Sequence, residues 1–139
     1  MKLIIINGPN LKNIGIREPD FYGNVDFNQY LKDLKTEFEN IEIEYFQSHT
    51  ESEIVNKIHQ VSEYFDGVIL NAGAYSHTSV AIRDAIVAAG MKVILVHISN
   101  VYSREPFRHS NIIAPVCNGI ITGFGLSSYR LALLSFLNN

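Results

Sequence analysis

Five short apolar runs, separated by longer segments of mixed polarity, constrain the fold of this chain more than any other feature. The runs lie at residues 3–6, 41–46, 67–70, 92–96 and 119–122. Several of them are apolar at every position, which is typical of strands buried on both faces of a parallel sheet. Strands that alternate with helical segments predict an α/β fold with right-handed crossovers.

Four segments carry the periodicity of amphipathic helices, with apolar side chains three and four residues apart. They lie at residues 26–39, 50–65, 78–90 and 127–137. A five-stranded parallel sheet with helices on both faces closes as a flavodoxin-like three-layer sandwich of strand order 2-1-3-4-5. Since 139 residues suit one domain and no linker is visible, we expect a single flavodoxin-like domain over residues 1–139.

Helix ends can also be located from the sequence. TESE at residues 50–53 predicts a capping box, in which Thr50 and Glu53 bond to each other's backbone N–H groups. Thr78 or Ser79 is expected to cap the start of the third helix. Gly90 is expected to cap its end.

Composition excludes several classes of protein. A formal net charge of −3 argues against general attraction to nucleic acid. The single cysteine, Cys117, forms no intrachain disulfide and lies in an apolar stretch that favours a core role over a nucleophilic one. No apolar run is long enough for a signal-peptide core or a membrane span. We expect a cytoplasmic protein with no nucleic-acid or membrane partner.

Polar and cationic side chains gather just after the predicted strands. In open parallel sheets, ligands bind beyond the carboxyl ends of the strands, near the point where the strand order reverses. The candidates in these segments are Asn7, Asn10, Arg17, Tyr22, Asn71, His77, His97, Ser99, Arg104, Arg108 and His109. Three arginines and three histidines at one edge of an acidic protein predict a receptor for a small anion.

Each candidate also has a structural interpretation. Asn7 and Asn71 belong to a residue type that caps turns, and a lone histidine is more often structural than catalytic. Arg104 and Arg108 flank Glu105, which is available as a surface ion-pair partner. The site interpretation is favoured because so many candidates converge on one edge.

Signals for a cofactor are weak. No pair of His or Cys residues has zinc-like spacing with a third ligand. GFGLSS at residues 123–128 lacks the later glycine of a nucleotide-binding loop, and there is no Walker sequence. We expect neither a metal nor an organic cofactor. A flavodoxin-like nucleotide or flavin protein is the generic alternative.

Longer motifs run almost from end to end of the chain. They are NGPNL, G-REP-YG, QSH-E-E, N-GAYSHTSVAIRDA, VHISNV-SRE-FRHS and G-I-GFG--SYRLAL. In these motifs the chain resembles the type II 3-dehydroquinate dehydratases, shikimate-pathway enzymes of this size and fold. The resemblance implies an anti elimination of water from 3-dehydroquinate, through an enolate, to give 3-dehydroshikimate without a cofactor. It also implies a homododecamer built from trimers.

The resemblance also assigns roles to individual residues. It implies that Tyr22 is the base, that His97 is the acid, that Arg17 assists the base, and that Asn10 holds a water beside the enolate. The segment at residues 15–23 would then be a lid that delivers Tyr22 and Arg17. The implied substrate-binding residues are Asn71, His77, Asp84 from a neighbouring subunit, Ile98 through its backbone, Ser99, Arg104 and Arg108.

One departure from the family pattern concerns the acid. The family usually has Glu two residues before this histidine, where it orients the imidazole, and this chain has Leu95. Without that acceptor, His97 needs another partner to fix its tautomer. The alternative hypothesis is therefore a substrate-binding homologue with impaired catalysis.

Overall fold

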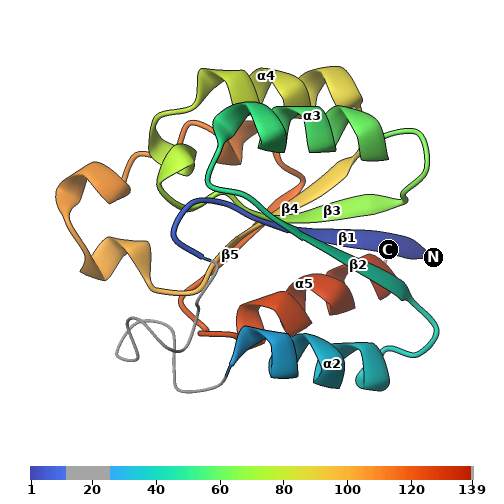
Figure 1. Ribbon diagram of the computed structural model, residues 1–139. Helices are drawn as coiled ribbons and strands as arrows, with labels where there is room; N and C mark the ends of the chain where they lie inside the picture. Colours follow the sequence, from blue (N-terminus) through green and yellow to red (C-terminus); the bar gives the residue numbers. More distant parts are fainter. Residues whose placement is uncertain (12–25, 139) are drawn as a thin grey trace.

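A single parallel sheet forms the centre of the molecule. The computed structural model describes residues 1–11 and 26–138 (Figure 1). Its strands are β1 (Lys2–Asn7), β2 (Glu42–Gln47), β3 (Gly67–Asn71), β4 (Lys92–His97) and β5 (Gly119–Thr122). They pair in parallel in the order β2-β1-β3-β4-β5, which confirms the predicted topology.

Helices cover both faces of this sheet, as predicted for a three-layer sandwich. In Figure 1, α3 and α4 lie on one face, and α2 and α5 lie on the other. Their bounds are α2 (Phe27–Glu37), α3 (Glu51–Val61), α4 (Val80–Ala89) and α5 (Ser127–Leu137). Short 3₁₀ turns connect the elements: η1 (Gly73–His77), η2 (Val101–Ser103), η3 (Pro106–Arg108) and η4 (Ala114–Val116). None of the helices in the described part of the chain has the length and apolar composition needed to span a bilayer.

The strands supply both layers of the core. Because successive strand residues point to opposite faces, Ile5 packs with α2 and α5, whereas Ile4 and Ile6 pack with α3 and α4. Two apolar clusters therefore share one sheet. This arrangement explains why the central strands are apolar at nearly every position.

The ends of α4 match the sequence prediction. Ser79, rather than Thr78, is the N-cap, and its buried Oγ accepts a hydrogen bond from Ile82 N at 3.0 Å. Gly90 ends the helix at φ 65°, a left-handed conformation that glycine adopts without a side-chain penalty. Both caps of α4 are thus confirmed.

The predicted capping box of α3 is wrong. Thr50 is the N-cap residue, but its side chain makes no capping hydrogen bond with the described residues. Ser48 takes this role instead, because its Oγ accepts from Thr50 N at 2.9 Å and donates to Glu53 Oε2 at 3.1 Å. The hydroxyl that bonds at the start of α3 is therefore that of Ser48, two residues before Thr50, and it contacts the Glu53 carboxylate rather than the Glu53 backbone N–H.

A close approach of two loops shapes the edge of the sheet above β1 and β3. Gly8 N donates to Asn71 O at 2.7 Å, and a Cβ at Gly8 would lie 2.6 Å from Ala72 O. Only glycine fits there. The chain then turns at Asn10, with φ 65°, and Asn10 N donates to His49 Nδ1 at 3.1 Å. This turn brings Asn10 over the carboxyl ends of the strands.

Candidate functional site

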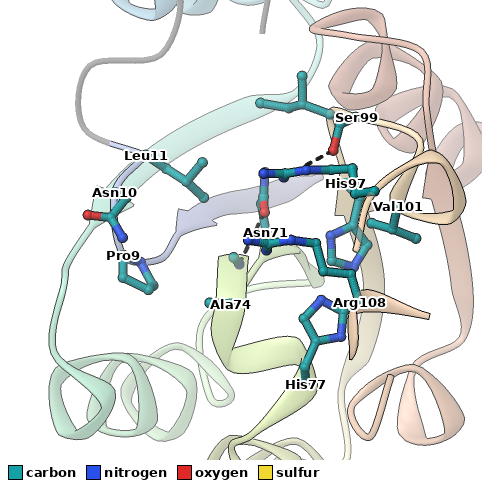
Figure 2. A pocket seen from close by; sticks show the side chains of 13 residues that line it. Pro9, Asn10, Leu11, Asn71, Ala74, His77, His97, Ser99, Val101 and Arg108 are labelled. Atoms are coloured by element: carbon teal, nitrogen blue, oxygen red, sulfur yellow. Dashed lines mark hydrogen bonds between the residues drawn. The ribbon is translucent and has the colours of Figure 1, made fainter. Parts of the chain in front are cut away.

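A pocket of about 150 Å³ opens beyond the carboxyl ends of β1, β3 and β4 (Figure 2). It lies where the strand order reverses, as the fold predicts for a ligand site. Its lining residues are Pro9, Asn10, Leu11, Asn71, Gly73, Ala74, His77, His97, Ile98, Ser99, Val101, Arg104 and Arg108. Eight of the residues singled out in the sequence line this one cavity: Asn10, Asn71, His77, His97, Ile98, Ser99, Arg104 and Arg108.

The remaining candidates fall elsewhere. Arg17 and Tyr22, with the expected lid, lie outside the described residues. Asp84 is exposed on α4, and it is not among the described residues that line the pocket of its own subunit. Asn7 is fully buried beneath the pocket, and His109 lines a neighbouring cavity of about 360 Å³.

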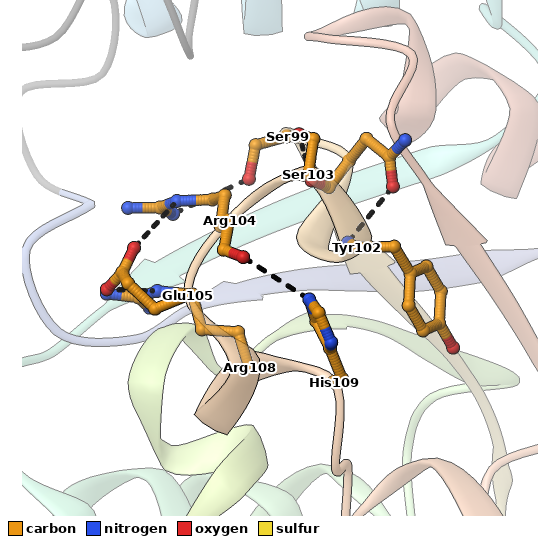
Figure 3. Close-up of polar contacts among 8 residues, drawn as sticks. Ser99, Tyr102, Ser103, Arg104, Glu105, Arg108 and His109 are labelled. Carbon is orange, nitrogen blue, oxygen red and sulfur yellow. Dashed lines mark hydrogen bonds and ion pairs between the residues drawn. The ribbon is translucent and has the colours of Figure 1, made fainter.

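Two arginines supply positive charge to the pocket, and one carboxylate offsets part of it. Figure 3 shows Glu105 beside Arg104 and Arg108. Arg108 Nε donates to Glu105 Oε2 at 3.2 Å, and Arg104 Nε lies 3.9 Å from Glu105 Oε1. The pKa of Glu105 is lowered, chiefly by its own backbone N–H and then by Arg108, so this carboxylate stays ionised. Arg104 and Arg108 therefore lie beside Glu105 and also line the pocket, so both interpretations of these residues are correct.

His97 ends β4 and is only 7 % exposed. Its ring stacks on that of His77, with centroids 6.1 Å apart and an interplanar angle of 18°. Burial, followed by the nearby His77, Arg104 and Arg108, lowers the pKa of His97 to about 4. With this pKa, the imidazole is neutral at pH 7.

His77 is held by the loop that follows η3. Its Nδ1 lies 2.7 Å from Ser110 O, and a carbonyl oxygen only accepts hydrogen bonds. His77 Nδ1 therefore carries a proton. The contact fixes the imidazole against one wall of the pocket, where it stacks on His97.

A buried polar network forms the floor. Tyr129 OH donates to Asn7 Oδ1 at 2.7 Å and accepts from Asn71 Nδ2 at 3.0 Å. Gly73 N donates to Asn71 Oδ1 at 3.2 Å, so both ends of the Asn71 amide are oriented. Sequence reasoning did not single out Tyr129. The sequence does hold one signal for its role, since Tyr129 lies in an apolar helical segment, and the hydroxyl of a buried tyrosine needs a hydrogen-bond partner.

Metal and thiol chemistry have little support among the described residues. Within this part of the chain, no three His, Cys, Asp or Glu side chains are placed to hold a metal ion. Burial raises the pKa of Cys117 to about 12, which keeps its thiol protonated. The thiol lies 3.4 Å from Ile113 O, to which it donates. A packing role for Cys117 fits these observations.

Comparison with known proteins gives one consistent family. Residues 1–137 match the family model described as dehydroquinase class II. A 3-dehydroquinate dehydratase from a Nitratiruptor species is 51% identical over 137 residues, covering 97% of this chain and 88% of the relative. The crystal structure of type II dehydroquinase from Butyrivibrio crossotus matches with TM-score 0.91 and 46% identity, covering 100% of this chain and 98% of that one.

A second solved structure supports the same assignment at greater sequence distance. The type II dehydroquinase from Propionibacterium acnes matches with TM-score 0.93 and 34% identity. The match covers 99% of this chain and 97% of that chain. Sequence, fold and the residues gathered around the pocket agree, and the chain belongs to the class II dehydroquinase family.

Proposed function

We propose that this protein dehydrates 3-dehydroquinate to 3-dehydroshikimate, the type II reaction of the shikimate pathway. The observation that carries the proposal is the pocket beyond β1, β3 and β4, which gathers the side chains that the family motifs assign to substrate. The substrate is a small carboxylate with several hydroxyl groups and a ketone. Guanidinium, imidazole, hydroxyl and amide groups suit such a molecule.

Binding divides between the two sides of the pocket. Arg108, assisted by Arg104, takes the substrate carboxylate, since a planar guanidinium can bind it through two parallel hydrogen bonds. The substrate hydroxyl groups are bound away from these arginines, by His77, Asn71, Ser99 and the backbone of Ile98. Asp84, exposed on α4, belongs to the site of a neighbouring subunit in this proposal.

The chemistry requires a base and an acid on opposite faces of the ring. Tyr22, assisted by Arg17, removes the proton next to the ketone and leaves an enolate, which a water held by Asn10 stabilises. His97 then donates a proton to the departing hydroxyl, which leaves as water. Because burial and the nearby positive charges lower the pKa of His97 to about 4, it takes up this proton once the anionic substrate offsets those charges.

Assembly and location follow the family in the same proposal. We expect a cytoplasmic homododecamer of trimers, in which the α4 residue Asp84 completes a neighbouring site. Native mass measurement tests the assembly, with twelve times the chain mass of 15.6 kDa expected. A monomer with full activity would contradict the role of Asp84 across subunits.

The comparisons give no support to the alternative of a homologue with impaired catalysis. The relatives that match across nearly the full length are called 3-dehydroquinate dehydratases. Leu95 is fully buried in the apolar cluster beneath α3 and α4, so its side chain packs in the core. A flavin or nucleotide protein likewise finds no support in the family assignment.

The direct test is turnover of 3-dehydroquinate by the purified protein, followed by the ultraviolet absorbance of the conjugated enone product. Tyr22→Phe should lower kcat by about 10²-fold or more, because general-base catalysis is lost. Binding of the substrate should remain. Tyr64→Phe is the matched control, because this tyrosine is 72% exposed and lies outside the pocket lining. Normal turnover in Tyr22→Phe would overturn the proposed mechanism.

A further inference from the structure

The described residues give His97 a side-chain partner that the family motifs do not indicate. Asn111 lies between η3 and η4, and its Nδ2 is 3.1 Å from His97 Nε2. Leu95, at the position where the family has a carboxylate, is apolar and fully buried. Asn111 therefore meets the imidazole from a different element, 14 residues later in the chain.

The orientation of the Asn111 amide is fixed by the backbone that follows it. Its Oδ1 lies 3.1 Å from Ile113 N and 2.9 Å from Ala114 N, and both of these groups are donors. Only the oxygen of the amide can accept them. The amide nitrogen must therefore face His97, and the assignment of oxygen and nitrogen does not depend on the histidine.

This orientation determines the tautomer of the ring. An amide N–H only donates, so His97 Nε2 accepts with its lone pair. A neutral imidazole that accepts at Nε2 carries its proton on Nδ1. We propose that Asn111 is the positioning residue of His97, holding the ring as the Nδ1–H tautomer in place of the family's carboxylate.

The contact has a further chemical consequence. A carboxylate beside an imidazole stabilises the imidazolium, whereas the amide N–H of Asn111 stabilises the neutral ring, because it donates to the Nε2 lone pair that a proton would occupy. Among the described residues, the cations Arg104 and Arg108 and the second imidazole, His77, also oppose protonation of the ring. Asn111 thus acts in the same direction as its neighbours. The pH range in which the acid is active depends on this residue.

Asn111→Asp is the sharpest variant, because it replaces only the group that faces His97. One carboxylate oxygen keeps the hydrogen bonds from Ile113 N and Ala114 N. The second oxygen replaces the amide nitrogen, so the group that faces His97 Nε2 accepts a hydrogen bond where Asn111 donates one. The ring should change to the Nε2–H tautomer, and the pKa of His97 should rise by about 1 to 3. Asn118→Asp is the matched control, since Asn118 Oδ1 accepts from Val93 N near the opposite end of β4.

Solid-state ¹⁵N NMR of histidine-labelled protein reads the tautomer directly and is independent of assembly size, with His97→Gln used to assign the signals. We expect Nδ1–H in the unsubstituted protein and in Asn118→Asp, and Nε2–H in Asn111→Asp. The alkaline limb of the kcat–pH profile should move upward only in Asn111→Asp. An Nε2–H ring in the unsubstituted protein, or no change in Asn111→Asp, would overturn the inference.

The effect on turnover rests on the proposed function, whereas the NMR result does not. If the tautomers are as expected but the unsubstituted protein does not turn over 3-dehydroquinate, the proposed function fails and the role of Asn111 stands. If turnover is normal and the tautomer is unaffected by Asn111→Asp, the proposed function stands and the inference fails.

Discussion

At the scale of the residue, the buried His97 links the site to stability. Its pKa of about 4 in the folded protein lies below the ordinary value of 6.5, so the unfolded chain binds the proton more tightly. The contribution of the neutral ring is therefore complete above pH 6.5 and is lost as the pH falls towards 4. Since one pKa unit corresponds to about 1.4 kcal/mol, the loss approaches about 3 kcal/mol.

His97→Gln removes this titration while keeping a polar side chain. The free energy of unfolding of the unsubstituted protein should fall more steeply between pH 6.5 and pH 4 than that of the variant. Urea unfolding at several pH values measures both curves, and groups that titrate in both proteins cancel in the difference. Parallel curves would show that His97 is not held neutral by the fold.

Tyr129 is the residue on which the pocket floor depends. Tyr129→Phe removes the hydroxyl and leaves Asn7 Oδ1 and Asn71 Nδ2 without this partner in a buried site. We expect a loss of about 1–3 kcal/mol in the free energy of unfolding. The KM for 3-dehydroquinate should rise as well, because Asn71 is less well oriented.

Tyr45→Phe is the control for that variant. Tyr45 OH accepts from Asn7 Nδ2 at 3.4 Å, a long hydrogen bond at the edge of the same network. Its removal should have a smaller effect on stability and leave KM unchanged. Equal effects of the two substitutions would contradict a specific role for Tyr129 beneath the pocket.

The sequence indicates part of this site, for physical reasons that differ between residues. His97 and Asn71 could be predicted because they directly end apolar strands, and parallel strands bring their carboxyl ends to one edge. Tyr129 and Asn111 could not, because their roles depend on partners brought close by tertiary packing. Tyr129 and Asn7 are 122 positions apart. No local spacing encodes that contact.

At the scale of the element, the start of α3 provides a direct test of the corrected cap. Ser48→Ala removes the hydroxyl that bonds Thr50 N and Glu53 Oε2, and this side chain is buried. The free energy of unfolding should fall by about 1–2 kcal/mol. Thr50→Ala should change it by less than about 0.5 kcal/mol, because this hydroxyl makes no cap with the described residues.

Thermal or urea unfolding of the two variants distinguishes the two patterns. If Thr50→Ala lowered the free energy of unfolding more than Ser48→Ala, the capping box that the sequence predicts would be supported after all. The failed prediction has a local cause, since both TESE and the preceding Ser48 can supply a hydroxyl near Glu53. The sequence does not decide which of them does, because this depends on how β2 leaves the sheet. At α4, by contrast, Ser79 and Gly90 lie directly at the helix ends.

At the scale of the whole molecule, the alternation of side chains along the strands joins the two apolar clusters. Ile4 and Ile5 are adjacent in β1 but belong to opposite layers, and the same holds for Ile69 and Leu70 in β3. Since the same strands supply side chains to both layers, disruption of these strands removes packing from both layers at once. We therefore predict that residues 1–139 unfold as one cooperative unit.

A substitution in one layer should be detected by a probe in the other. The chain has no tryptophan, and among the described residues three tyrosines, Tyr30, Tyr45 and Tyr129, lie in the layer of α2 and α5, whereas one, Tyr75, packs against the other layer. Ile58→Ala, in the layer of α3, should destabilise the protein by about 2–5 kcal/mol. During unfolding of this variant, the near-ultraviolet circular dichroism of tyrosine and the far-ultraviolet circular dichroism of the backbone should change at the same lowered midpoint.

Leu34→Ala makes the same test from the opposite layer, since Leu34 is buried beside the tyrosine cluster. Because assembly also contributes to stability, all three proteins should be compared at one protein concentration. If Ile58→Ala lowered the backbone midpoint and left the tyrosine midpoint unchanged, the two layers would unfold separately. The pocket draws Asn71 and His97 from the ends of strands that belong to both layers, so its geometry depends on the single transition that we predict.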